Sequence, residues 1–248
     1  MSYIKTASQI EHIRVSCKIA TDILQRVLAH AKEGVTTLEL DTLAQKLCTE
    51  NKVEPSFKGY LKYPHATCIS VNEEVVHGLP GPRVLKKGDI VGIDFGVIYR
   101  GYYSDVARTI PVGAVSIEAD KLMVVTKTAL RKAIEQVKPG QTVGDIGHAV
   151  QTYVEAADMG VVRDLVGHGV GTAVHEPPAI PNYGKPGTGV QLVPGMVIAL
   201  EPMVTLGHHN VVLMDDGWTF KTKDGSLAAH FEDTMVVTER GHEVLTSF

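Results

Sequence analysis

The order of turns and apolar runs is repeated once along this chain, and this repetition restricts the folds that the chain can adopt. Residues 34–36 and 140–142 both read Gly-x-Thr, lie 106 residues apart and each follow a helical stretch. Residues 85–94 align with residues 192–201, since each segment has a leucine, a glycine three residues later and a carboxylate six residues after the glycine. Short turn motifs recur by chance, but their shared order predicts two related units.

Each unit is predicted to begin with two helices and to continue with strands. Apolar residues at helical spacing and short apolar runs indicate these elements. We expect helices at residues 7–33, 38–49, 119–137 and 143–157, and strands of the first unit at residues 67–71, 89–98 and 102–110. The expected fold is α+β, a pseudo-two-fold repeat of two α-α-β units with a central antiparallel sheet and helices on the outside. It would form a single domain over 1–248 with halves of about 1–112 and 113–248; two unrelated α/β halves are the alternative.

Composition excludes several classes of protein. The net charge is -4 and no long basic run is present, so we expect neither nucleic acid nor an anionic membrane as a direct partner. No stretch approaches the ~18–20 apolar residues of a membrane span, and the N-terminal residues lack the apolar core of a signal peptide. Cys17, Cys48 and Cys68 cannot all pair and show no metal-binding spacing. A reduced, cytoplasmic location is the simplest interpretation.

Two aspartates interrupt apolar strands in the first half. Asp94 lies in an otherwise apolar run, the chain turns near residue 100, and the return strand carries Asp105. This spacing places the two carboxylates almost opposite each other, where like charges repel and burial is costly. Arg108 could neutralise one of them, but two facing aspartates favour a divalent cation.

The second half supplies further groups of the same kind. Glu201 and Glu232 also lie within apolar surroundings, and His168 stands between glycines that would let the backbone approach whatever the imidazole binds. With Asp94 and Asp105 the carboxylates carry four negative charges, which two divalent cations would balance. Oxygen ligands with a single imidazole favour Mn, Fe, Co or Zn. A water bound between two such ions has a lowered pKa and becomes a nucleophile at neutral pH.

Several segments together resemble the methionine aminopeptidases of the pita-bread fold, and the resemblance covers nearly the whole chain. The matching segments are residues 68–78, 88–94, 101–105, 167–171, 175–176, 200–202 and 230–234. The resemblance implies a metalloaminopeptidase, a hydrolase that removes the initiator methionine from nascent proteins. It implies two divalent metal ions (Co, Mn, Fe or Zn), with the ligands Asp94, Asp105, His168, Glu201 and Glu232.

The same resemblance implies roles in catalysis and in substrate binding. Glu201 would also act as the general base that shuttles a proton to the leaving amine. His77 would contact the scissile amide nitrogen, and His175 would stabilise the oxygen of the tetrahedral intermediate. These two histidines hold corresponding places in the repeat, so the pseudo-symmetry predicts that they flank the metals from opposite sides.

Methionine selectivity requires an apolar pocket that accepts a flexible thioether. By family correspondence its walls are Phe57, Tyr60, Tyr63, Cys68 and Trp218. Trp218, the only tryptophan, lies in a hairpin-like loop and could equally be a packing anchor. Position 174, where bacterial relatives usually have phenylalanine, is Val174 here, so the pocket floor is expected to be wider or less selective.

The spacing of the ligands indicates the type I subgroup. Only 33 residues separate His168 from Glu201, and 31 separate Glu201 from Glu232, which leaves no room for the large helical insertion of type II enzymes. Aminopeptidase P and prolidase share the five ligand types, but they usually carry a large N-terminal domain and an Arg-Ile-Glu-Asp run where this chain has residues 230–233. Pita-bread proteins without catalysis lose metal ligands, and here all five are present.

The resemblance also sets expectations for partners. The substrates would be nascent polypeptide N-termini, and the resemblance allows a transient association with the ribosome. A monomer in the cytoplasm is expected, without nucleic acid or membrane as a direct partner.

Overall fold

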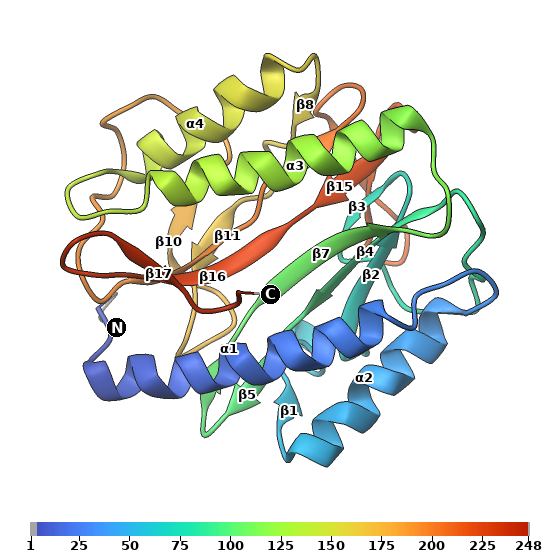
Figure 1. Ribbon diagram of the computed structural model, residues 1–248, viewed down its shortest axis with the longest axis horizontal. Helices are drawn as coiled ribbons and strands as arrows, with labels where there is room; N and C mark the ends of the chain where they lie inside the picture. Colours follow the sequence, from blue (N-terminus) through green and yellow to red (C-terminus); the bar gives the residue numbers. More distant parts are fainter. Residues whose placement is uncertain (1–3, 248) are drawn as a thin grey trace.

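The computed structural model describes residues 4–247. Residues 4–247 contain four α-helices, and in the view of Figure 1 one pair lies above the central strands and the other below them. The first pair is α1 (Ala7–Leu28) and α2 (Thr37–Asn51), and the second is α3 (Ile117–Glu135) and α4 (Val143–Glu155). The predicted helices are therefore confirmed, although α1 ends five residues before the expected boundary.

An antiparallel eight-stranded sheet forms the centre of the molecule. Seven of its strands follow the order β10 (Glu176–Ile180), β9 (Gly167–Gly169), β11 (Val197–Leu200), β16 (Glu232–Val237), β7 (Val106–Pro111), β4 (Ile90–Phe95) and β2 (Thr67–Val71). The eighth, β17 (His242–Val244), pairs with β16. Strands β16 and β7 join the two halves through Glu232 opposite Ala107 and Asp233 opposite Val106.

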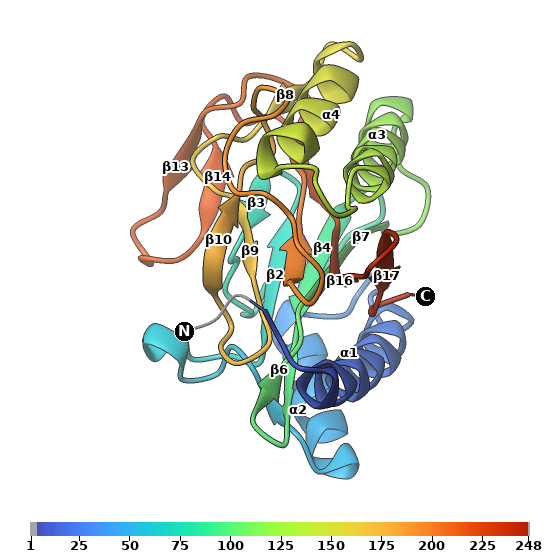
Figure 2. The ribbon, with the colours of Figure 1, turned by 90° about the vertical axis from the view of Figure 1, so that its left-hand side faces the viewer.

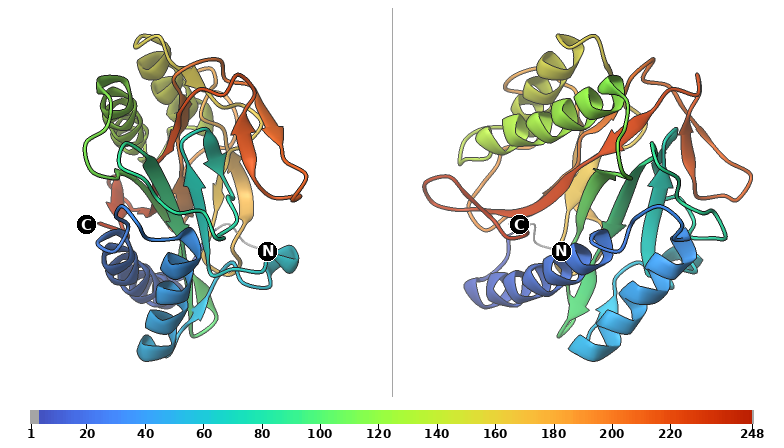
Figure 3. Two further views of the ribbon diagram at one scale, coloured as in Figure 1. Left: turned by 90° about the vertical axis from the view of Figure 1, so that its right-hand side faces the viewer. Right: turned by 45° about the vertical axis from the view of Figure 1, so that its right-hand side comes forward.

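Three small sheets complete the fold. They contain β1 (Glu54–Pro55), β5 (Val97–Tyr99) and β6 (Tyr102–Tyr103); β8 (Gly160–Val161), β12 (Met203–Thr205) and β15 (Ala228–His230); and β3 (Glu74–Val76), β13 (Val211–Leu213) and β14 (Phe220–Thr222). The helices gather on one face of the curved sheet, and the β13–β14 hairpin projects on the other (Figures 2 and 3). The face opposite the helices is therefore left for the side chains that line the site.

The internal repeat is present in the hydrogen bonds. Thr36 caps α2 and Thr142 caps α4, each with a capping box that satisfies the first amides of the helix. The turn before each capping threonine contacts the segment that precedes a strand of the same half. Gly34 N donates to Leu85 O, before β4, at 2.9 Å, and Gly140 N donates to Leu192 O, before β11, at 3.1 Å. Within each half, the Gly-x-Thr turn is thus hydrogen-bonded to the first residue of the leucine-containing segment that the sequence alignment identified. Each helix pair covers its own cluster of buried aliphatic side chains.

Two of the expected strands are broken, and the predicted register of the aspartates is wrong in detail. Residues 89–98 form β4 and β5, with a break at Gly96, where the backbone passes so close to Ser104 O that a Cβ would lie 2.0 Å from it. Asp94 is opposite Ala107, while Asp105 precedes β7. Both carboxylates nevertheless line the same cavity. No helix within residues 4–247 combines the length and apolar character of a membrane span.

Candidate active site

One cavity of about 160 Å³ collects every side chain that the sequence singled out for chemistry or substrate binding. Its lining comprises Phe57, Tyr60, Tyr63, Cys68, His77, Asp94, Asp105, His168, His175, Glu201, Trp218 and Glu232, together with Leu61. These residues are distributed along most of the chain, so only the fold brings them together. Polar groups lie along one part of the lining and aromatic groups along another.

The carboxylates at the cavity are crowded, and in the described part of the chain three of them each have one buried oxygen without a hydrogen-bond partner. Within residues 4–247, one buried oxygen of each of Asp94, Asp105 and Glu232 accepts no hydrogen bond. Burial raises the pKa of Asp94 to about 7, and burial together with neighbouring carboxylates raises the pKa values of Asp105, Glu201 and Glu232 well above their usual range. Such a set is unfavourable unless positive charge lies among its members.

His168 has the orientation of a metal ligand. Its Nδ1 donates to the Gly169 carbonyl at 3.0 Å, which leaves Nε2 as an unprotonated acceptor in the neutral ring. Nε2 faces carboxylate oxygens of Glu201 at 3.4 Å and Asp105 at 3.8 Å. Burial lowers the pKa of His168 to about 3, so the ring is neutral at pH 7 and the lone pair of Nε2 points toward these carboxyl groups. A cation between them fits this arrangement, and Asp105, His168 and Glu232 each place a ligand atom within 4.8 Å of the others.

The glycines beside His168 were expected to let the backbone approach whatever the imidazole binds, but they instead allow the neighbouring strands to approach closely. A Cβ at position 167 would lie 2.5 Å from Ala199 O, and one at position 169 would lie 2.3 Å from Pro177 O. Strand β9 lies between β11 and β10, so the glycines permit close strand packing. The two glycines therefore position the His168 imidazole by holding strand β9 in place, and neither glycine lines the cavity.

The sequence suggested that Arg108 could neutralise Asp94 or Asp105, but Arg108 pairs with a different aspartate. Its Nη2 lies 2.7 Å from Asp233 Oδ1, and its Nη1 donates to the carbonyl of Glu232. It therefore stabilises the backbone of a predicted ligand on β16.

The two predicted catalytic histidines lie on the cavity lining close to His168. The rings of His168 and His175 are 4.3 Å apart between centroids, and Nδ1 of His175 lies 3.0 Å from the Tyr60 hydroxyl. His77 has a left-handed backbone with φ of 59° and contacts Phe220 edge-on. Burial, with a contribution from His175, lowers the pKa of His77 to about 4, and burial lowers that of His175. Both rings are therefore neutral at pH 7.

The apolar part of the cavity has the walls that family correspondence assigned. Phe57, Tyr63, Cys68 and Val174 form a buried cluster, and Tyr60 and Trp218 pack against it. Trp218 lies in the turn between β13 and β14, as expected, with its ring edge-on to Tyr63 at 5.0 Å between centroids. Its packing role and its place on the cavity lining are thus compatible.

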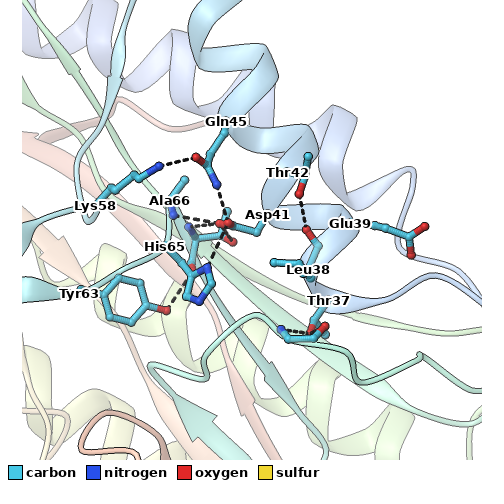
Figure 4. Close-up of polar contacts among 12 residues, drawn as sticks. Thr37, Leu38, Glu39, Asp41, Thr42, Gln45, Lys58, Tyr63, His65 and Ala66 are labelled. Atoms are coloured by element: carbon cyan, nitrogen blue, oxygen red, sulfur yellow. Dashed lines mark hydrogen bonds and ion pairs between the residues drawn. The ribbon is translucent and has the colours of Figure 1, made fainter.

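Asp41 is a buried residue near the pocket that the sequence analysis missed. Its Oδ1 accepts from the amides of Ala66 and Thr67 at 2.9 Å each, and its Oδ2 accepts from Gln45 at 2.7 Å (Figure 4). These bonds tie α2 to the loop that carries Tyr63. A carboxylate on the otherwise apolar face of a helix was the signal that could have revealed it.

His230 is the second group that sequence reasoning left without a role. It is 4% exposed, and within the described chain its Nε2 has no hydrogen-bond partner. That nitrogen lies 3.6 Å from Glu201 and 4.0 Å from Glu232. The signal was available, because residues two apart on an extended chain share a face, and His230 precedes Glu232 by two.

The chain is similar to proteins of known class over its whole length. Residues 11–239 match the model of metallopeptidase family M24. A methionine aminopeptidase of Clostridium acetobutylicum is 47% identical over 99% of both chains, and the crystal structure of the Thermotoga maritima methionine aminopeptidase has a TM-score of 0.98 at 48% identity, covering 100% of both chains. A prolidase from Pyrococcus furiosus has a TM-score of 0.81 at 27% identity, and this chain covers 66% of it. The chain belongs to metallopeptidase family M24 and, within it, to the methionine aminopeptidases.

Proposed function

We propose that this chain removes the initiator methionine from newly made proteins by hydrolysing their first peptide bond. The observation that carries the proposal is the cavity, which joins a buried group of carboxylates and imidazoles to an apolar wall. Relatives named methionine aminopeptidase support the same reaction. Nascent polypeptide N-termini are the proposed substrates, and the whole chain acts as one catalytic domain.

Two divalent ions, Co, Mn, Fe or Zn, are proposed as the cofactor. Their ligands would be Asp94, Asp105, His168, Glu201 and Glu232. The unpartnered carboxylate oxygens and the lone pair of His168 that faces Glu201 support this assignment. When bound, the ions supply polarisation of the scissile carbonyl and a water of lowered pKa.

Glu201 is the proposed general base. Its carboxylate lies at the end of β11, between the imidazoles of His168 and His230, and Asn182 holds its backbone carbonyl at 3.0 Å. A carboxylate fixed in this way takes a proton from the attacking water and delivers it to the leaving amine. This shuttle requires little motion because the side chain is already held between its neighbours.

His77 and His175 are proposed to act as neutral hydrogen-bonding groups on the peptide. His77 would contact the scissile amide nitrogen, and His175 would donate to the oxygen of the tetrahedral intermediate. Their lowered pKa values support the neutral form. The Tyr60 hydroxyl beside His175 would orient its ring.

The methionine side chain is proposed to occupy the apolar part of the cavity. Phe57, Tyr63 and Cys68 would form its walls with Tyr60 and Trp218. Val174, which packs in the same buried cluster as Phe57, Tyr63 and Cys68, would form the floor. A valine there leaves more space than a phenylalanine, so we expect tolerance of norleucine and of bulkier residues at the first position.

The decisive experiment adds Mn or Co to metal-free protein and compares hydrolysis of Met-Ala-Ser with that of Ala-Pro-Ala. Metal-dependent release of methionine alone is expected, because the pocket is apolar and of a size for one side chain. Glu201→Gln, which removes the proposed base but leaves its shape, is the matched control and should lose about 10²- to 10⁴-fold in kcat. Cleavage of Ala-Pro-Ala would place the chain with the X-Pro peptidases, and silence on both peptides would refute the proposed activity.

The proposed setting is a monomer in the cytoplasm that associates transiently with the ribosome. The net charge of -4 argues against direct binding to nucleic acid or to an anionic membrane. Sedimentation of the purified protein, alone and with ribosomes, tests the monomeric state and the association.

A further inference from the structure

A buried ion pair joins the start of the chain to the loop that carries His175. Lys5 Nζ contacts the Glu176 carboxylate across 171 positions of sequence, and the two side chains are 3% and 8% exposed. Figure 2 shows the first described residues, in dark blue, passing beside the turn between β9 and β10. Buried pairs of this kind are costly to desolvate, so the partners must be well held.

Lys5 is anchored by its own backbone. Its amide donates to Gly195 O at 2.8 Å, and Ile4 forms a β-bridge with Met196 just before β11. Close packing surrounds the side chain as well: a Cβ at Gly171 would lie 2.6 Å from Ile13 Cδ1 and 3.3 Å from Lys5 Cε. The ammonium group is therefore presented from a fixed strand edge, without the freedom of a surface lysine.

Glu176 uses its other carboxylate oxygen to close the loop. Oε1 accepts from the Thr172 amide, from the Thr172 hydroxyl at 2.6 Å and from the Ala173 amide at 2.9 Å. Burial alone would raise the pKa of Glu176, but the hydrogen bonds from Lys5 and Thr172 outweigh burial and lower it. One carboxylate thus determines the path of the two residues that follow Ala173, namely Val174 and His175.

We propose that Lys5 and Glu176 are positioning residues, which hold the 172–176 loop so that Val174 closes the methionine pocket and His175 points at the reacting carbonyl. The inference rests on the proposed function of His175. It extends that function to a part of the chain far from the cavity lining, since neither Lys5 nor Glu176 lines the cavity. A displacement of a catalytic group by about 1 Å can cost on the order of 100-fold in rate, so a loop that carries one needs such a support.

The test uses variants of the pair in the metal-loaded full chain. Lys5→Met and Glu176→Ala are each expected to lower kcat for Met-Ala-Ser about 10- to 100-fold, with metal content unchanged. Lys5→Arg keeps the charge and should restore kcat to within about threefold of wild type. Arg14→Met is the matched control, because Arg14 also pairs with a carboxylate far along the chain, Glu243, but this pair is exposed and neither residue lines the cavity. It should leave kcat unchanged.

Amide hydrogen exchange provides a readout that does not depend on turnover. Loss of the Glu176 carboxylate should accelerate exchange at Thr172 and Ala173, whose amides donate to it, while β11 stays protected. This result would test the positioning role even if the chain failed to release methionine. A failure of the proposed function is therefore distinguishable from a failure of this inference.

Thr172→Ala provides a milder variant in case Lys5→Met or Glu176→Ala does not fold. The Thr172 side chain is exposed, so its loss removes one hydrogen bond to Glu176 without opening the core. We expect a kcat reduced severalfold and faster exchange at residue 173. The inference is overturned if Lys5→Met, Glu176→Ala and Thr172→Ala all match Arg14→Met in kcat, or if the exchange of the 172–173 amides is unchanged.

Discussion

At the scale of single residues, the site is a set of charges that the protein alone does not balance. Burial raises the pKa of Asp94 from 3.8 to about 7. A folded pKa above the unfolded value means that the folded state binds more protons, so the contribution of Asp94 makes the metal-free protein less stable as the pH rises from about 4 to about 7. The carboxylates are therefore suited to hold cations and poorly suited to stabilise the fold.

Asp94→Asn should for this reason stabilise the metal-free protein at pH 8 and leave it unchanged at pH 4. The rise of the Asp94 pKa from 3.8 to about 7 sets an upper limit of about 4 kcal/mol on the gain. Urea unfolding of the metal-free forms at the two pH values measures it. Equal stability at pH 8 would show that the Asp94 carboxylate carries no such penalty.

Residue identity alone indicated the chemistry at some positions and not at others. Asp94 and Glu201 were visible because a carboxylate inside an apolar run is costly without a partner. Asp41 escaped notice because its helix also carries polar residues on its exposed face. Four of its five hydrogen bonds come from residues 65–67, a segment that the sequence does not place, and only the bond from Gln45 lies within α2. The role of Glu176 could not be recognised from the sequence, because its partner Lys5 is 171 positions away.

At the scale of elements, the helix starts show the repeat most clearly. Thr36 and Thr142 cap α2 and α4 with the same two hydrogen bonds. The amide of the third helical residue donates to the threonine hydroxyl oxygen, and the threonine amide donates to the side-chain carboxylate of that third residue. A capping box is a local signal, because it depends only on the capping residue and the residue three positions later. Strand breaks are not, since the break at Gly96 depends on the carbonyl of Ser104 in the neighbouring strand.

Replacing either capping threonine by alanine should cost about 1 kcal/mol of unfolding free energy, because one helical amide loses its acceptor. The two sites share no partner, so the double variant should lose about 2 kcal/mol. Urea unfolding of the metal-loaded single and double variants measures both effects. Thr49→Ala, near the end of α2, is a control with an exposed hydroxyl, and a loss there as large as at Thr36 would argue against a capping effect.

At the scale of the whole molecule, the proposed ligands come from both halves of the repeat. Asp94 and Asp105 belong to the first half and the other three to the second, and β7 pairs with β16 at the boundary. A cation bound by all five would therefore tie the halves together. Binding to the folded state alone stabilises it by mass action.

Removal of metal with a chelator should accordingly lower the Tm, and Mn added back at about 100 times its Kd should restore about 2.7 kcal/mol of stability. Asp94→Asn should show a smaller metal-dependent rise, because one ligand is lost. Calorimetry with and without Mn measures both proteins. A wild-type Tm insensitive to metal would contradict the assignment of these residues as ligands.

The sequence by itself determined the helices, the two-unit order and the residue types of the site, because periodicity, caps and misplaced charges are local signals. It also carried the family resemblance, which the whole-length similarity confirms. The tertiary structure alone decided that Asp94 faces Ala107, that Arg108 pairs with Asp233 and that the glycines around His168 serve strand packing. It also revealed the Lys5–Glu176 pair. These features depend on distances between segments far apart in the chain, and such distances exist only once both halves have folded around the central sheet.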